Sequence, residues 1–389
     1  MLQIDHIYEF LYQEIFKDFA LCHLPNGIIF TKKEEISLSD ISIFTQKELT
    51  DKNIFLYDQE PLVVELSDKY IRFFSNFLGI NILITSEFSA LINQYVEKNN
   101  LYKMYYFFHG FAALDWYRGY YALNYNKLIV KQYNHDFISF NRIINNDRSY
   151  RIYFVSLLKE QGLLDHGLVS FNVTDNLFDD WQDEVTDPNS KLSEKAKQHA
   201  KQHLLEIDKL VIDHTELLGS ASASILRTIT GYWPNNDQPN VDAFWHIVTE
   251  TVFYYDKLHL TEKIFKPIAS KQPFMLLAAP GNLAYLKSYG FKTFDCVIDE
   301  NYDLIQDNDL RTEAVVEQLH WYCDLTPGEK TDLIQQLEPI IQHNFNHFYG
   351  EFRHIIAREL LDNTKTLFKE IGYDDGHIDY FNIHHVLTN

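Results

Sequence analysis

The sequence predicts a soluble α/β protein built from two domains. The chain has 389 residues, which is long for one α/β core and sufficient for two. Short apolar runs rich in β-branched and aromatic residues alternate with segments of helix length, a pattern typical of mostly parallel sheets. A polar stretch rich in Lys, Glu and Gln begins near residue 187 and separates two such regions.

The first domain is expected within residues 1–186. An amphipathic helix over about residues 2–19 opens it, and residues 88–99 predict a second helix. Between and after these helices, runs of β-branched or aromatic residues bounded by polar turns predict strands. These runs are 27–31, 41–45, 53–57, 81–85, 104–108 and 127–131.

Three further segments complete the expected organisation. Residues 187–211 predict an exposed connecting helix with a cap at Asn189 or Ser190. The second α/β domain is expected at 212–345, with strands near 243–249, 273–278 and 292–297. A helical stretch over about 326–370 indicates that the C-terminal segment, 346–389, packs back across the first domain.

Composition and charge argue against several classes of function. A net charge of −21 disfavours broad binding to duplex DNA or to an anionic membrane, because such binding depends on Lys and Arg. The three cysteines, Cys22, Cys296 and Cys323, are widely spaced and predict neither a disulfide framework nor a zinc site. The N-terminus lacks the pattern of a secretion signal, and no segment is apolar enough to span a membrane, so we expect a cytoplasmic protein.

A candidate anion site lies in the second domain, where a helix is expected to begin at Thr261. Thr261 is a good N-cap, and the apolar residues after it recur at helical spacing. The free N–H groups of a helix start, together with Lys263 and with Lys266 one turn further on, suit a diphosphate, and Glu262 suits ribose hydroxyls. The alternative is a capped surface helix whose charged residues are simply solvated.

This segment resembles the donor signature of α1,3-fucosyltransferase-like enzymes. In those enzymes a strand ending in Glu is followed by a loop, Thr-Glu-Lys, a helix and a strand. Here the strand 244–250 ends in Glu250, Thr-Glu-Lys follows at 261–263, and an apolar strand is expected at 272–277. The chain also resembles uncharacterised, largely phage-encoded glycosyltransferase-like proteins that continue, as here, with Pro-Gly-Asn-Leu-Ala-Tyr-Leu at 280–286.

The resemblance implies a GT-B architecture, in which two Rossmann-like domains face a central cleft and the C-terminal domain holds the nucleotide sugar. It implies that Lys263 holds the pyrophosphate, that Glu262 holds the ribose, and that Glu250 lines the same pocket. Residues 251–252 are Thr-Val where the family has Asn-Ser, and the loop is longer. Guanine and fucose specificity therefore do not carry over.

An upstream arginine in that family helps to neutralise the donor phosphates. Arg227 is the best-placed candidate here, with Arg148 and Arg151 as competitors, although each of them suits a surface ion pair as well. The acidic segments 179–180 and 307–309 resemble metal-binding acids only superficially. A helix start with a lysine stabilises a leaving diphosphate without a cation, so we expect no essential metal and no cofactor besides the nucleotide-sugar co-substrate.

An inverting transfer needs a base that takes the proton of the acceptor hydroxyl. Glu60 is the first candidate and Asp58 the second, because their turn follows an expected strand and Pro61 keeps Glu60 out of helical geometry. The fucosyltransferase-like enzymes have a Glu-containing segment ending in Pro at a comparable point. His109 is the alternative base, since it follows the run 104–108 and imidazole titrates near neutrality. The plainer alternatives are two solvated acids and a hydrogen-bonded histidine under an aromatic cluster.

The sequence therefore predicts a metal-independent, inverting glycosyltransferase that moves a sugar from a nucleotide sugar to an acceptor hydroxyl. Glu60 or His109 would activate the hydroxyl while the nucleoside diphosphate departs onto Lys263. One alternative acceptor is a hydroxymethylated DNA base of a phage genome, against which the acidity of the chain weighs. Another alternative is a non-catalytic protein that binds a sugar nucleotide or a glycan.

Overall fold

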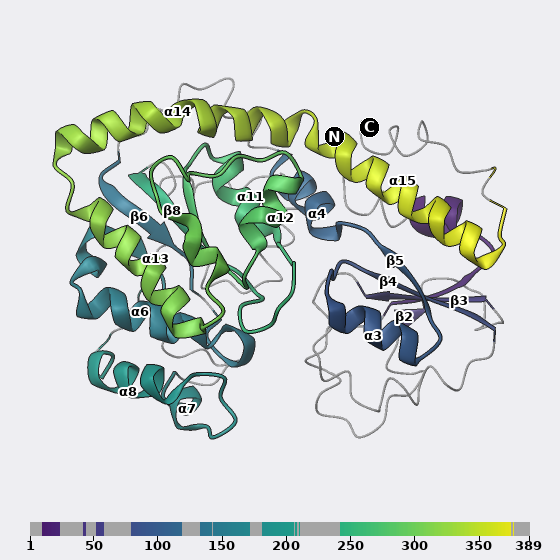
Figure 1. Ribbon diagram of the computed structural model, residues 1–389, viewed down its shortest axis with the longest axis horizontal. Helices are drawn as coiled ribbons and strands as arrows, with labels where there is room; N and C mark the ends of the chain where they lie inside the picture. Colours follow the sequence, from purple (N-terminus) through teal and green to yellow (C-terminus); the bar gives the residue numbers. More distant parts are fainter. Residues whose placement is uncertain are drawn as a thin grey trace. The chain divides into compact units, whose positions relative to one another are not determined.

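The protein is α/β and contains two sheets made mostly of parallel strands (Figure 1). The computed structural model describes residues 10–23, 42–43, 52–57, 79–118, 133–141, 143–171, 181–205, 207, 210, 242–374 and 376. The chain divides into two compact units. The first comprises residues 1–115, 257–259 and 350–389, and the second comprises 116–256 and 260–349.

Within the described residues, the sheet of the first unit has the strand order β2-β1-β3-β4-β5. Its strands are β1 Ala20–His23, β2 Ser42–Ile43, β3 Lys52–Tyr57, β4 Ile80–Thr85 and β5 Tyr102–Tyr105. β2 runs antiparallel to β1, and the other neighbouring strands are parallel. β4 is buried along nearly its whole length, as expected for a strand with neighbours on both sides and cover on both faces.

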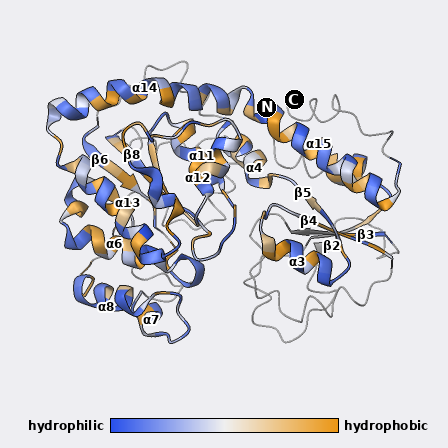
Figure 2. Ribbon diagram, viewed as in Figure 1, coloured by the Kyte–Doolittle hydropathy of each residue, from blue (hydrophilic) through white to orange (hydrophobic). Residues whose placement is uncertain are grey.

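The described part of the first unit also contains helices. They are η1 Phe10–Ile15, α3 Ala90–Lys98, α4 Phe108–Trp116, whose last residue belongs to the second unit, and α15 Phe352–Ile371. α15 alternates apolar and polar residues (Figure 2) and packs on β5, with Phe368 against Phe16 and Phe19. Residues 257–259 join this unit through an antiparallel bridge between Phe88 and Leu258. The segment near the C-terminus therefore forms part of the same core as the N-terminal strands.

The sheet of the second unit has the order β7-β6-β8-β9, and its described strands are all parallel. These strands are β6 His135–Ser139, β7 Gly167–Val169, β8 Ala243–Thr249 and β9 Phe274–Leu277. β8 is buried at every position and is mostly hydrophobic (Figure 2). The chain runs from β6 to β7 in one direction and from β8 to β9 in the other, so the strand order reverses between β6 and β8.

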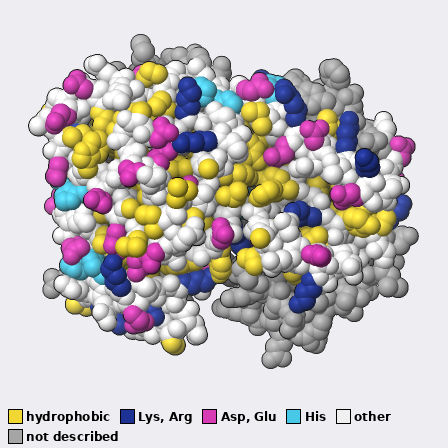
Figure 3. All heavy atoms as spheres, viewed as in Figure 1, with side chains coloured by type: hydrophobic (Ala, Val, Ile, Leu, Met, Phe, Trp, Pro, Cys, Tyr) yellow, Lys and Arg dark blue, Asp and Glu magenta, His cyan; other side chains and the backbone are white. Residues whose placement is uncertain are grey.

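Helices surround the second sheet. α6 packs against α8 and α13, and α11 packs against α14. The described helices are η3 Asn146–Arg148, α6 Tyr150–Glu160, η4 Leu163–His166, α7 Trp181–Thr186, α8 Glu194–His203, α11 Glu262–Ala269, α12 Asn282–Ser288, η6 Glu300–Leu304, α13 Asn308–Cys323 and α14 Pro327–Tyr349. None of the helices in the described parts of the chain is long and apolar enough to cross a membrane. Acidic and basic side chains are interspersed on the face drawn in Figure 3.

Several expected elements are confirmed. β3, β4, β8 and β9 lie at the runs 53–57, 81–85, 243–249 and 273–278, and α3 lies within 88–99. α11 begins after Thr261, as expected from the capping pattern. The runs 27–31 and 127–131 lie outside the described residues, as do residues 2–9 of the opening helix and all but residues 42–43 of the run 41–45.

The strand expected at 292–297 is wrong, because this segment forms turns instead. Phe294 is buried and packs edge-on against Trp245, so the apolar character of the segment reflects burial alone. Side chains replace the neighbouring strand: Lys292 N–H donates to Asn344 at 2.8 Å, and Phe294 N–H donates to Glu300 at 2.8 Å.

Three other elements differ in position from the sequence prediction. β5 ends at Tyr105 and α4 begins at Phe108, so residues 106–108 are not strand. The connecting helix begins later than expected, because Ser193 caps α8 by accepting a hydrogen bond from Ala196 N–H at 3.0 Å. Residues 116–186, expected in the first domain, belong to the second unit because β6 pairs with β8.

Candidate functional site

The reversal of strand order in the second sheet creates a candidate binding position at the carboxyl ends of β6 and β8. β6 leads into α6 and β8 leads into α11, so both helices begin at this edge of the sheet (Figure 1). The two crossovers run in opposite directions, and because such crossovers are right-handed, α6 and α11 cover opposite faces. Open α/β sheets bind ligands at this type of switch point.

Buried hydrogen bonds fasten the two strand ends together. Thr249 Oγ1 donates to the Phe140 carbonyl at 3.0 Å, which joins the end of β8 to the residue after β6. The Arg151 guanidinium donates to the Thr249 carbonyl at 2.6 Å, and the Tyr150 hydroxyl donates to the Glu250 carbonyl at 2.6 Å. Burial lowers the pKa of Arg151. The buried Arg151 guanidinium is hydrogen-bonded to main-chain carbonyls. Arg151 therefore holds the backbone at the carboxyl end of β8 in place.

Glu250 fixes the start of α11. Its side chain is fully buried, and its carboxylate accepts from Thr261 N–H at 3.0 Å, from Thr261 Oγ1 at 2.6 Å and from Thr251 N–H at 3.1 Å. The family resemblance implied that Glu250 lines the nucleotide pocket. That role stays a prediction. Its hydrogen bonds show that Glu250 positions the start of the helix, because a carboxylate there satisfies N–H groups that have no partner within the helix.

Lys263 is held at the N-terminal turn of the same helix. Its ammonium lies 3.1 Å from Thr261 Oγ1, 3.2 Å from Thr251 Oγ1 and 3.3 Å from Glu262 Oε1, and 34% of its side chain is exposed. Thr261 is the N-cap, and its hydroxyl accepts from Lys263 N–H at 3.4 Å. The Lys263 ammonium therefore lies beside the positive end of the helix dipole, paired there with Glu262, and the dipole and the ammonium each favour an anion at this position.

Two further α11 residues expected at the donor site have defined surroundings. The Lys266 ammonium lies 3.7 Å from the centre of the Phe140 ring, so it reaches from α11 to the end of β6. Such a cation–π contact holds a positive charge without neutralising it. The Glu262 side chain is 18% exposed, and its main-chain carbonyl accepts from the Tyr117 hydroxyl at 3.2 Å. The structure thus brings Glu262, Lys263 and Lys266 to the edge where β6 and β8 end.

Asn141, which the sequence gave no reason to select, lies at the end of β6. It is fully buried, its main-chain N–H donates to Ser170 Oγ at 2.9 Å, and its Nδ2 donates to Ser139 Oγ at 3.1 Å. Its Oδ1 has no hydrogen-bond partner in the described part of the chain. An unpaired buried acceptor is costly, and a bound ligand that donates a hydrogen bond would remove that cost.

Of the other two arginines expected to bind the donor phosphates, the structure describes Arg148 and not Arg227. Arg148 ends η3, is half-buried, and lies close enough to Arg151 for its positive charge to contribute, after burial, to the lowered pKa of Arg151. Arg227 lies outside the described residues, as do Glu60 and Asp58, the two expected catalytic acids. β3 ends at Tyr57, immediately before Asp58.

His109 is the second residue of α4, and it belongs to the first unit. Its exposed fraction is 7%, and its ring lies edge-on to that of His259, with 5.0 Å between the ring centres. Lys257, two residues before His259, forms a buried ion pair with Glu87, and its Nζ lies 3.0 Å from Glu87 Oε1. His109 is therefore part of a buried polar region of the first unit.

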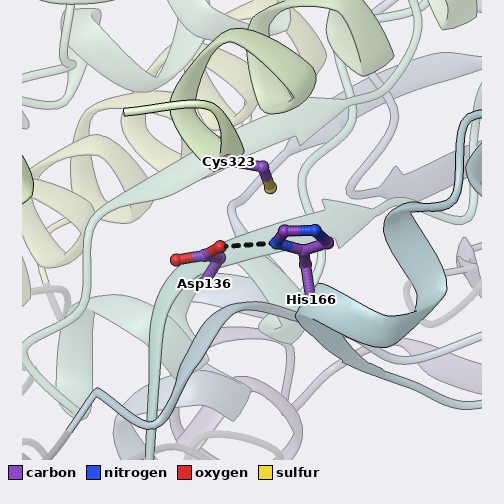
Figure 4. A group of neighbouring side chains, drawn as sticks. All are labelled: Asp136, His166 and Cys323. Carbon is purple, nitrogen blue, oxygen red and sulfur yellow. Dashed lines mark hydrogen bonds and ion pairs between the residues drawn. The ribbon is translucent and has the colours of Figure 1, made fainter. Parts of the chain in front are cut away.

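A second cluster of reactive side chains lies at the opposite, amino end of β6. Asp136, His166 and Cys323 point toward one another (Figure 4), with His166 Nδ1 3.0 Å from Asp136 Oδ2. Lys330 Nζ also contacts Asp136, at 2.7 Å. Burial and the negative charge of Asp136 raise the pKa of the Cys323 thiol to about 12. A nucleophilic cysteine needs a lowered pKa, so this cluster does not support cysteine catalysis.

Comparison with protein-family models, with curated proteins and with solved structures gives no match for this chain.

Proposed function

We propose that this protein is a nucleotide-sugar-dependent glycosyltransferase whose second unit binds the donor. The observation that carries the proposal is the Lys263 ammonium, held by Thr251 and Thr261 at the first turn of α11. This turn lies at the switch point between β6 and β8, where α/β proteins bind nucleotides. The helix dipole and the lysine together suit the diphosphate of a sugar nucleotide.

The surroundings of this turn support the rest of the donor assignment. Glu262 lies beside Lys263 on the same turn and has the acceptor oxygens that ribose hydroxyls need. Lys266 adds a second positive charge one turn further along. Asn141 supplies a buried acceptor without a described partner, which suits an N–H or O–H group of the nucleoside.

Two α/β units with parallel sheets are compatible with a GT-B architecture, which forms part of the proposal. The proposed reaction is an attack by an acceptor hydroxyl on the anomeric carbon as the nucleoside diphosphate leaves onto Lys263 and the start of α11. Glu60, Asp58 or His109 takes the hydroxyl proton in this scheme. We propose a glycan or another hydroxyl compound as the acceptor, since the acidity of the chain disfavours DNA.

Thermal unfolding with a panel of sugar nucleotides and nucleoside diphosphates tests donor binding. A ligand at a hundred times its dissociation constant stabilises the folded protein by about 2.7 kcal/mol, which raises Tm by several degrees. We expect this rise with at least one compound. Lys263→Met should weaken the binding at least about tenfold, because it removes a charge next to the diphosphate and keeps the apolar stem.

The matched control is Lys292→Met, which removes an exposed lysine of the same unit, remote in sequence from α11. It should leave the affinity unchanged. Absence of stabilisation by every sugar nucleotide would overturn the proposal, and so would equal binding by Lys263→Met and the wild type. Release of free nucleoside diphosphate by Glu60→Gln and His109→Ala variants then tests the base. Binding without any release in the wild type would indicate a non-catalytic sugar-nucleotide-binding protein.

A further inference from the structure

A group of three potential metal ligands lies where α6 and α8 pack together, outside the proposed donor site. Glu160 is the last residue of α6, and His199 and His203 are four residues apart on α8, so they share one helix face. In the space-filling view, histidine and acidic side chains gather on the surface near these two helices (Figure 3). The cluster joins the end of one helix to the face of another.

The distances between the ligand atoms suit a small cation. His199 Nε2 lies 3.0 Å from Glu160 Oε2, and His203 Nε2 lies 3.8 Å from Glu160 Oε1, so each ring faces a different carboxylate oxygen. One ligand atom from each residue lies within 4.8 Å of the others. Tetrahedral ligands about 2.0–2.2 Å from a zinc ion lie about 3.3–3.6 Å apart, which small side-chain rotations would achieve here.

The hydrogen bonds of Ser156 fix the proton on the far side of the His199 ring. Ser156 Oγ donates its single proton to the Tyr153 carbonyl at 2.7 Å, and it lies 2.8 Å from His199 Nδ1. Ser156 must therefore accept from His199 Nδ1–H. With its proton on Nδ1, neutral His199 directs the Nε2 lone pair at the Glu160 carboxylate, so a metal ion between the two would take both as ligands. Metal-binding histidines are held in the same way by a hydrogen bond at the other ring nitrogen.

The packing of the two rings and the exposure of the three side chains leave room for a metal ion. The His199 and His203 rings are stacked, with 4.4 Å between their centres and 27° between their planes. One metal ion can take a nitrogen from each of the two adjacent rings as ligands. The side chains of His199, His203 and Glu160 are 16%, 20% and 45% exposed, so an ion and a water ligand have access.

We propose that Glu160, His199 and His203 bind one zinc ion or a similar divalent transition-metal ion, with water completing the coordination. Two imidazoles and a carboxylate suit zinc, cobalt and nickel, whereas calcium and magnesium prefer oxygen ligands. The ion fastens α8 to the end of α6. The second cluster, at Asp136, is a poorer site because Lys330 already contacts that carboxylate.

Metal titration of the full-length, chelator-treated protein tests this site. We expect one zinc ion to bind per chain with micromolar or tighter affinity, and cobalt to give a spectrum without a sulfur-to-metal band. His203→Ala should weaken zinc binding more than tenfold. Ser156→Ala should weaken it about tenfold or more, because it removes the hydrogen bond that orients His199.

The matched control is His166→Ala, which removes the histidine of the Asp136 cluster and should leave zinc affinity unchanged. The far-ultraviolet circular dichroism of each metal-free variant should match that of the wild type. If His203→Ala perturbs folding, His203→Asn replaces it, since that side chain keeps a polar atom near the helix. Unchanged zinc affinity in the His203 variant, a sulfur-to-cobalt band, or loss of binding in His166→Ala would each overturn the assignment.

Discussion

Glu250 and Thr261 are joined by two hydrogen bonds, from the Thr261 N–H at 3.0 Å and from its hydroxyl at 2.6 Å, to the two oxygens of one buried carboxylate. These bonds connect the end of β8 to the N-cap of α11. The same Thr261 hydroxyl lies 3.1 Å from the Lys263 ammonium. The carboxylate, the cap and the lysine thus form one chain of hydrogen bonds, so the position of the lysine depends on the buried acid.

This chain predicts a large effect of Glu250→Gln on stability. The glutamine amide presents N–H groups to donors and loses the charge that strengthens the three bonds, so we expect a loss of at least about 2 kcal/mol in the free energy of unfolding. Thr261→Val should cost about 1 kcal/mol because it removes the cap, and Thr261→Ser should be nearly neutral. Urea unfolding measures all three. A Glu250→Gln protein as stable as the wild type would show that the carboxylate does not hold the helix start.

A second prediction concerns the ribose. If Glu262 accepts hydrogen bonds from ribose hydroxyls, the wild type should bind the preferred nucleoside diphosphate about tenfold more tightly than its 2′-deoxy counterpart. Glu262→Ala should bind the two compounds alike. Calorimetric titration of both proteins with both compounds measures this difference. Glu317→Ala, which removes an exposed glutamate of α13, should keep the discrimination. Undiminished discrimination in Glu262→Ala would exclude contact with the 2′-hydroxyl.

The two described free cysteines should differ in reactivity. Because the pKa of Cys323 is raised to about 12, its thiolate fraction at pH 8 is about 10⁻⁴, whereas Cys296 is exposed. Brief treatment of the native protein with iodoacetamide should label Cys296 and leave Cys323 unlabelled, as peptide mass spectrometry can measure. Asp136→Asn should accelerate labelling of Cys323, because it removes a negative charge and leaves the Lys330 charge unopposed. Equal labelling rates of both cysteines in the native protein would contradict this.

Asp303 predicts a pH dependence of stability. Burial raises its pKa to about 6, and its Oδ2 accepts from Leu283 N–H at 3.1 Å. Between pH 4 and 6 the folded state holds a proton on Asp303 that the unfolded state has released, so this group makes stability fall as pH rises. The slope reaches at most about 1.4 kcal/mol per pH unit.

The comparison of wild type with Asp303→Asn measures this effect, because titrating groups that do not interact with Asp303 contribute equally to both proteins. The variant should gain stability relative to the wild type as pH rises from 4 to 6, with no further gain above about pH 7. Urea unfolding at several pH values measures the difference. Parallel stability curves over this range would mean that Asp303 titrates alike in the folded and unfolded states.

Local patterns in the sequence were sufficient for the start of α11 and for the strands on either side of it. Thr261 caps the helix through its own side chain, and β8 and β9 are apolar runs between turns. Residues close together in the sequence are therefore enough to predict these three elements. The run 292–297 shows where such patterns fail. Its apolar residues indicate burial, and only the positions of Asn344 and Glu300 decide that its backbone is bonded by side chains rather than by a strand.

The sequence by itself determined an α/β chain with a capped helix start that carries Glu262 and Lys263. Only the tertiary structure decided that β6 lies beside β8, that Glu250 faces Thr261, and that Glu160 meets His199 and His203. Caps and periodicity depend on residues within one or two turns, which the sequence shows directly. Strand order and the contacts between distant side chains depend on which apolar surfaces pack together. A local sequence pattern does not show which surfaces these are.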